Sequence, residues 1–134
     1  MLQEREPDPY CTTDRFAAKN GMKVTELGDG WAKAQKLITD SDPNGLDIPM
    51  GGVYFTLADL SFGAANDYIA HGVVTLNSSI EFIASAKLGD TITAECKTVA
   101  KARKIVRNEV EVTDQDGKLL ALVRVTGYRK ETWK

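Results

Sequence analysis

The stretch that decides the fold is GGVYFTLADLSFGAANDY, which spans residues 51–68. Apolar residues recur in it at the i, i+4 and i+7 spacing of a helix face, and further apolar residues fill much of the remaining circumference. We therefore predict one helix from Gly51 or Gly52 to about Tyr68 that is buried on most sides against a sheet. The remaining stripe is small and polar and consists of Gly52, Thr56, Asp59, Gly63 and Asn66.

Asp59 carries the only charge in this stripe. Acidic residues are rarely placed amid so much apolar surface without a partner or a task, so Asp59 is a candidate functional carboxylate. The alternative is a solvated charge on an exposed edge of the helix.

The sequence patterns on both sides of this helix indicate strands. Residues 73–83, 91–100, 105–113 and 118–128 alternate apolar and polar residues, and Asp116-Gly117 is a hairpin turn. Residues 22–27 and 30–38 predict another hairpin, preceded by a short helix that begins at Thr12 or Thr13 and ends at Asn20-Gly21. We predict an α+β fold in which a curved antiparallel sheet wraps around one long central helix.

Length and composition limit the class of protein. The chain has 134 residues, of which 43% are hydrophobic. We therefore predict one domain over residues 1–134, with residues 1–11 as a polar tail.

A net charge of −2 argues against nucleic acid as a partner. The polar N-terminus and the lack of an apolar run near ~18 residues predict no signal or membrane segment and a cytoplasmic location. Cys11 and Cys96 are isolated and predict two reduced thiols.

The segment NGLDIPMGGVYFTLAD at residues 44–59, followed by AKLGD at residues 86–90, resembles hotdog-fold acyl-CoA thioesterases of the phenylacetate-pathway type. That family reads Asn, a short loop, His-Gly-Gly, a helix with Leu-Ala-Asp, and later a turn similar to Pro-Ala-Lys-Gly-Asp. The resemblance covers roughly residues 15–128, and the Gly-Gly-x-x-x-Thr-Leu-Ala-Asp core is fairly specific because its pieces occur in the family's order and spacing. It implies a hotdog fold and hydrolysis of acyl-CoA thioesters, with coenzyme A as part of the substrate and no metal or redox cofactor.

The resemblance also implies roles for individual residues. Asp59 would act as nucleophile on the thioester or as base for water, and Gly51 would offer its backbone N–H to the thioester oxygen. Asn44 would hold the attacking water or the substrate, and the Thr75 hydroxyl would support the catalytic group. Met50 stands where the family usually has His, and it has no hydrogen-bond donor for a carbonyl.

The start of the central helix is a candidate oxyanion site on chemical grounds alone. Residues 49–52 present unpaired backbone N–H groups at the positive end of the helix dipole, and glycine lets a carbonyl come close. The alternative is that Gly51 and Gly52 merely begin a tightly packed helix. Met50 and Gly52 are candidate substrate contacts, with Met50 as a soft apolar contact for an acyl chain.

Asp59 and Gly51 are too far apart to act on one carbon within one chain. Eight residues separate them, which is about 12 Å at ~1.5 Å of rise per residue. Two such helices packed antiparallel across a two-fold axis would bring Asp59 of one chain to the Gly51 end of the other. We therefore predict a homodimer, or a dimer of dimers, with the site at the subunit interface.

A basic hairpin is the candidate site for the phosphates of coenzyme A. Arg103, Lys104 and Arg107 provide its candidate contacts. The alternative is a solvated edge that Glu109 and Glu111 balance in charge.

Two other functions remain open at this point. We read the sequence as a thioesterase, and the first alternative is a non-catalytic acyl-CoA binding module that lacks turnover because of Met50. A hotdog dehydratase is disfavoured because it would use a His base in the helix region. His71, the only histidine, lies outside that motif. A histidine just after a helix more often caps the helix C-terminus than acts as a base.

Overall fold

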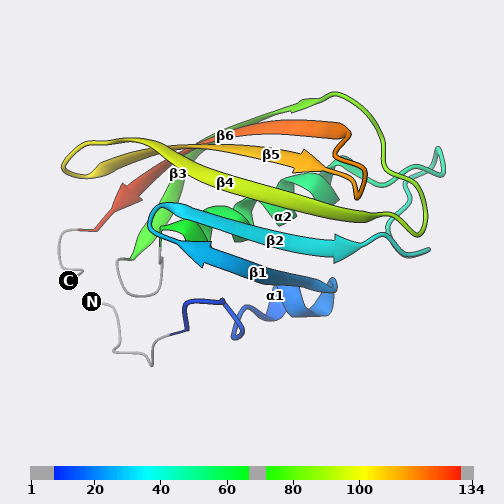
Figure 1. The fold of residues 1–134 in the computed structure, drawn as a ribbon, viewed down its shortest axis with the longest axis horizontal. Helices are drawn as coiled ribbons and strands as arrows, with labels where there is room; N and C mark the ends of the chain where they lie inside the picture. Colours follow the sequence, from blue (N-terminus) through cyan, green and yellow to red (C-terminus); the bar gives the residue numbers. More distant parts are fainter. Residues whose placement is uncertain (1–7, 67–71, 131–134) are drawn as a thin grey trace.

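The computed structural model describes residues 8–66 and 72–130. These residues form two helices and six strands, and Figure 1 shows α2 lying across one face of the sheet. Their bounds are α1 Arg15–Lys19, β1 Met22–Gly28, β2 Trp31–Leu37, α2 Gly51–Ala65, β3 Val73–Phe82, β4 Thr91–Lys101, β5 Ile105–Thr113 and β6 Leu119–Arg129.

All six strands form one sheet in the order β1-β2-β4-β5-β6-β3. Every neighbouring pair is antiparallel. The strand that follows α2 in the chain, β3, therefore lies at the edge of the sheet farthest from β1, and the curved sheet encloses the helix (Figure 1). The predicted α+β hotdog fold is confirmed, and the predicted strands agree with the observed ones to within about a residue at most of their ends.

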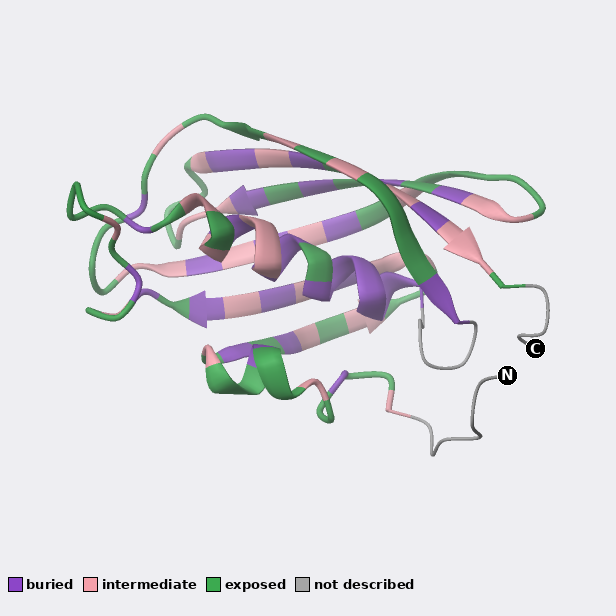
Figure 2. Ribbon diagram, turned by 180° about the vertical axis from the view of Figure 1, so that it is seen from behind, coloured by how far each residue is buried: buried purple, intermediate pink, exposed green. Residues whose placement is uncertain are grey.

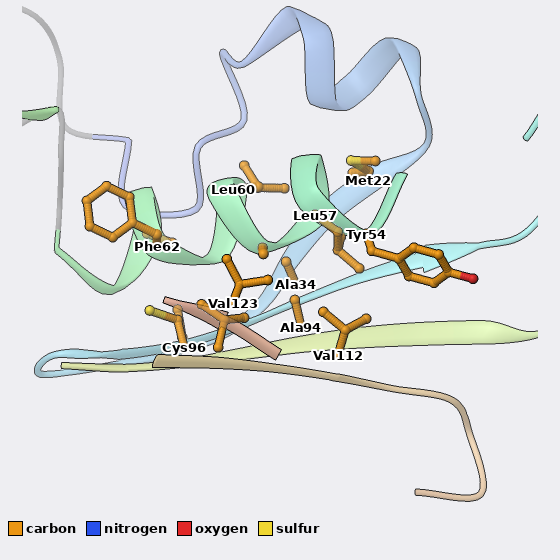
Figure 3. Packing of buried hydrophobic residues seen from close by; sticks show 14 of the residues in the cluster. Met22, Ala34, Tyr54, Leu57, Leu60, Phe62, Ala94, Cys96, Val112 and Val123 are labelled. Carbon is orange, nitrogen blue, oxygen red and sulfur yellow. The ribbon is translucent and has the colours of Figure 1, made fainter. Parts of the chain in front are cut away.

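Small residues on the sheet leave room for the central helix. Ala32, Ala34 and Ala94 are fully buried. Ala34 and Ala94 face Leu57 and its neighbours on α2 (Figure 3). Because an alanine occupies so little volume, the helix packs close to β2 and β4, with which it makes its densest contacts. Larger side chains on β5 and β6, such as Val112 and Val123, fill the space where the sheet curves away (Figure 3).

The predicted start of the first helix was wrong. Asp14 is the N-cap of α1, and its side chain accepts a hydrogen bond from the backbone N–H of Ala17. Thr12 and Thr13 instead donate backbone and hydroxyl hydrogens to the Asp8 carboxylate, which removes both from the capping position. The predicted end at Asn20-Gly21 is confirmed, because Asn20 is the C-cap and Gly21 has φ +68°.

The predicted polar stripe on the central helix is shorter than the sequence indicated. The helix ends at Ala65, and Tyr68 lies outside the described residues. Gly63 and Asn66 are buried, and Asn66 donates from its side-chain amide to Oδ1 of Asn108 on β5 at 3.0 Å. Asp59 and Gly52 are the exposed members of the stripe, with Thr56 half-buried between them.

Cys11 and Cys96 are both buried and free. Across residues 8–66 and 72–130, no helix has the length and apolar character needed to span a membrane.

Candidate active site

The centre of the site is the contact between helix α2 and the first part of β3. Asp59 lies midway along the helix, and the hydroxyl of Thr75 donates to its Oδ1 at 3.1 Å. The pairing of β3 with β6 shifts register between Thr75 and Asn77, which marks a β-bulge next to this contact. Bulges re-aim side chains, and this one sits where Thr75 turns toward the helix.

A glycine on the neighbouring strand lets the helix approach this part of the sheet. Gly127 on β6 pairs with Thr75, and a Cβ at Gly127 would lie 2.7 Å from Cζ of Phe62 and 2.9 Å from Cγ1 of Val73. Phe62 comes one turn after Asp59, so the ring that packs over Gly127 holds Asp59 beside Thr75. The sequence alone gives no signal for this role of Gly127, because the role depends on which residues meet across the two layers.

Asp59 and Thr75 line a pocket of about 220 Å³ together with Asp14, the N-cap of α1. Burial raises the pKa of the Asp59 carboxyl above its ordinary value, the Thr75 hydrogen bond opposes this, and the Asp14 carboxylate raises it further. Asp59 still has exposed surface in the protomer, so its desolvation here is partial. A carboxylate in this setting can serve as a nucleophile or as a general base.

Asp14 is a site residue that the sequence alone does not indicate. Its only sequence signal was that of a capping residue, and its proximity to Asp59 arises because α1 packs against α2.

The N-terminus of α2 forms a second group of predicted residues. Met50 is the N-cap, has no side-chain capping bond and is 58% exposed. The first N–H groups of a helix have no intrahelical acceptor, so those of Gly51 and Gly52 point out of the helix end. Gly52 faces open space, whereas a Cβ at Gly51 would lie 2.7 Å from Cζ of Phe82. Close packing against Phe82 therefore accounts for the glycine at position 51 but not for the one at position 52. The oxyanion role of Gly51 stays a prediction.

Asn44 lies in the loop that leads into this helix end. Its Oδ1 accepts from the backbone N–H of Leu46 at 2.8 Å, and its own N–H donates to the carbonyl of Ile48 at 2.7 Å. These bonds fix the loop and leave Nδ2 as the part of the side chain that a ligand can meet. Beside the loop, a pocket of about 280 Å³ is lined by Met50, Gly52 and Thr56, among others.

The basic hairpin lies at the other end of the sheet. Arg103 and Lys104 are in the turn between β4 and β5, and Arg107 is exposed on β5. The loop that carries Asn44 follows β2, and the end of β2 is hydrogen-bonded to the start of β4. The basic turn lies at the other end of β4, so the eleven residues of this strand separate the basic turn from the Asn44 loop (Figure 1). One protomer therefore does not bring the basic turn and Asn44 together.

Two residues of this hairpin contact side chains on β6. Glu109 is paired with Arg124 on β6, with Nε and Oε2 3.9 Å apart. Lys104 places its Nζ 5.9 Å from the centre of the Tyr128 ring. His71 lies outside the described residues, and the described ones contain no group of three or more His, Cys, Asp or Glu that could hold a metal ion.

An antiparallel sheet curved around one long helix defines a hotdog fold, and in this chain a carboxylate on that helix lies beside a hydroxyl on the edge strand. The family model of the Thioesterase superfamily matches residues 49–121, which include Met50, Asp59 and Thr75, and the chain belongs to that superfamily.

Similar proteins with more specific names support this assignment. The acyl-coenzyme A thioesterase PaaI of Escherichia coli (strain K12) is 27% identical over 116 residues, which cover 87% of this chain and 83% of the relative. The structure of the E. coli PaaI protein from the phenylacetic acid degradation operon has a TM-score of 0.82 at 26% identity and covers 86% of this chain and 83% of that one. The structure of smu.793 from Streptococcus mutans UA159 bound to acetyl-CoA has a TM-score of 0.77 at 28% identity, covering 83% and 90%. The predicted resemblance to thioesterases of the phenylacetate-pathway type is confirmed.

Proposed function

We propose that the protein hydrolyses acyl-CoA thioesters to a free acid and coenzyme A, with Asp59 as nucleophile or general base. The observation that carries this proposal is the hydrogen-bonded pair of Asp59 and Thr75 in a pocket on the central helix of a thioesterase-superfamily chain. Thioester cleavage needs such a group and a donor for the developing oxyanion. The N–H of Gly51 supplies the donor in this proposal.

The active unit in this proposal is a homodimer, or a dimer of such dimers. Within one helix, Asp59 and Gly51 are about 12 Å apart, so antiparallel packing of two α2 helices is needed to bring them to one carbon. The edge strand supports a subunit contact, because Val74, Leu76 and Phe82 on β3 are all exposed apolar residues. Figure 2 shows that much of this strand is exposed. An uncovered apolar edge strand is a pairing surface. A second subunit over the helix would also desolvate Asp59 further and raise its pKa more.

Coenzyme A would be bound through its phosphates by Arg103, Lys104 and Arg107, whose charge suits polyphosphate recognition. Asn44 would orient the water or the thioester, and Met50 and Gly52 would contact the acyl group in the pocket beside the helix end. No separate cofactor takes part. A coenzyme A thioester as substrate is in keeping with the cytoplasmic location predicted from the sequence.

A second candidate is a module that binds acyl-CoA without hydrolysing it. It is favoured by Met50, which places an exposed thioether where a hydrogen-bond donor would assist the oxyanion. Loss of one such donor typically costs a hundredfold or more in rate.

Thiol release separates the two candidates. Wild-type protein is mixed with aromatic, short-chain and long-chain acyl-CoA substrates, and free coenzyme A is measured with a thiol reagent, while calorimetry measures coenzyme A binding. Hydrolysis of at least one class, saturable and inhibited by coenzyme A, is the expected result. Binding of coenzyme A without thiol release from any class would select the binding module.

A further inference from the structure

A buried ion pair lies under the loop that leads into α2. Lys36 on β2 and Asp42 in the loop have side chains only 5% and 7% exposed, and Nζ of Lys36 is 3.2 Å from Oδ2 of Asp42. The same Nζ donates to the carbonyl oxygen of Asn20, the C-cap of α1, at 2.6 Å. Lys36 therefore connects the end of α1 to this loop across the start of the sheet.

Asp42 extends this connection to the helix end. Its Oδ2 accepts from the backbone N–H of Thr39 at 2.8 Å and from the Thr39 hydroxyl at 3.3 Å. Its backbone oxygen accepts from the N–H of Met50, the N-cap of α2, at 2.9 Å. Asp42 thus joins Thr39, at the start of the loop, to Met50, where α2 begins. Asn44 lies in the loop between Asp42 and Met50.

The energetics of this pair do not favour a purely stabilising role. Burying two charges costs about as much as their attraction returns, and apolar side chains of similar size often stabilise a fold as well or better. What distinguishes the Lys36–Asp42 pair from an apolar pair is the direction of its hydrogen bonds. An apolar pair would fill the same space but would not fix Thr39 or the carbonyl of Asp42.

We propose that Lys36 and Asp42 are positioning residues that hold the Asn44 loop and the N-terminus of α2 in the geometry that thioester hydrolysis requires. This proposal rests on the proposed function, because the groups being positioned are the predicted oxyanion donor and Asn44. The pocket of about 280 Å³ that Met50 and Gly52 line is also lined by Lys36 and Asp42, so the pair lies directly behind this part of the site.

The first test compares Lys36→Met with Lys33→Met. Lys33 is on the same strand and pairs with Glu26 at 3.5 Å, but the two side chains are 33% and 55% exposed. Lys33→Met therefore makes the same chemical change in an exposed ion pair away from the site. Displacing a catalytic group by about 1 Å can cost a hundredfold in rate, so we expect Lys36→Met to lower kcat by at least about tenfold. KM should change less than kcat, and Lys33→Met should leave both within about twofold, as expected for an exposed ion pair.

A double variant removes the risk that an unpaired buried carboxylate prevents folding. Lys36→Met/Asp42→Leu replaces the whole pair with apolar side chains, and we expect a melting temperature near that of wild type together with the same loss of kcat. Full kcat in this folded double variant would overturn the proposal.

Amide hydrogen exchange provides a readout that needs no activity. The Met50 N–H should exchange at least about tenfold faster in the double variant, because the carbonyl that protects it is no longer fixed, while the core amide of Ala94 should be unchanged. If wild-type protein released no thiol, the proposed function would fail and exchange alone would decide on the positioning role. Unchanged exchange at Met50 would then overturn it.

Discussion

The hydroxyl of Thr75 donates a 3.1 Å hydrogen bond to the carboxylate of Asp59, which ties the edge strand β3 to the central helix at the site. Burial favours the protonated form of this carboxyl and raises its pKa, whereas the Thr75 hydrogen bond favours the ionised form and lowers it. Burial is the larger effect. The bond therefore keeps a desolvated carboxylate available as a base or nucleophile and also fixes its direction.

Removing the Thr75 hydroxyl should change the pH profile as well as the rate. In Thr75→Val, the pKa of Asp59 should rise further because a bond to the charged form is lost. Activity requires ionised Asp59 and is lost as pH falls through this pKa, so the acid limb of kcat/KM should move to higher pH. A hydrogen bond to a charged group contributes enough that kcat at the plateau should fall about tenfold.

The conservative variant Thr75→Ser is the control for this experiment. It keeps the hydroxyl and should retain the wild-type acid limb. An unshifted limb in Thr75→Val, measured with correctly folded protein, would show that the bond does not act on Asp59 in the active enzyme.

Replacing Asp14 should move the same limb in the opposite direction. The Asp14 carboxylate raises the pKa of Asp59, so Asp14→Asn should lower that pKa and extend activity to lower pH. Asparagine caps a helix about as well as aspartate, so α1 should stay intact. Asp116→Asn, in the turn between β5 and β6, is the matched control and should leave the profile unchanged. A limb that stays in place in Asp14→Asn would mean that the two carboxylates are not coupled.

The two glycines at the start of α2 should respond differently to alanine. Gly52 faces open space, so Gly52→Ala should keep its stability or gain up to about 1 kcal/mol. Gly51→Ala moves only the far end of the exposed Phe82 ring, so its melting temperature should fall slightly at most, and Gly51→Ala/Phe82→Ala gives the new Cβ free space. If Gly51 also lies against the substrate carbonyl, thiol release should stay low in the double variant. Wild-type turnover in the double variant would assign Gly51 a packing role alone.

Much of the fold could be predicted from the sequence because each strand and the central helix carry their own periodic pattern. The start of α1 could not, because Thr12, Thr13 and Asp14 are all good caps and the choice depends on Asp8, whose carboxylate binds both threonines. The burial of Asn66 could not either, since its partner Asn108 lies 42 residues further along the chain.

For the site, the sequence pattern and the resemblance identified Asp59 and Thr75, and the structure places them in contact. The contribution of Asp14 and the Lys36–Asp42 pair depends on how α1 and the loop pack on the sheet, which no local pattern encodes. The predicted roles of Asn44, Gly51 and Arg103 depend on a second subunit or a ligand, so they stay predictions.

A shared site can be tested by mixing inactive variants. If each site takes Asp59 from one subunit and Asn44 from the other, a mixed dimer of Asp59→Ala and Asn44→Ala has one site with both changes and one with neither. Random pairing makes half of the dimers mixed, so co-refolding equal amounts should restore roughly a quarter of wild-type activity. Activity no higher than the mean of the two variants, despite proven subunit exchange, would exclude the composite site.

The central claim is that Asp59 carries out thioester hydrolysis, and thiol release by Asp59→Asn tests it most directly. Asparagine keeps the shape of the side chain but is neither nucleophile nor base, so turnover should fall at least about a hundredfold. Burial raises the folded-state pKa of Asp59, so its ionised form reduces stability at pH values above that pKa, and the melting temperature of Asp59→Asn at neutral pH should be unchanged or higher. Near-full thiol release by Asp59→Asn with an unchanged melting temperature would contradict the proposed mechanism.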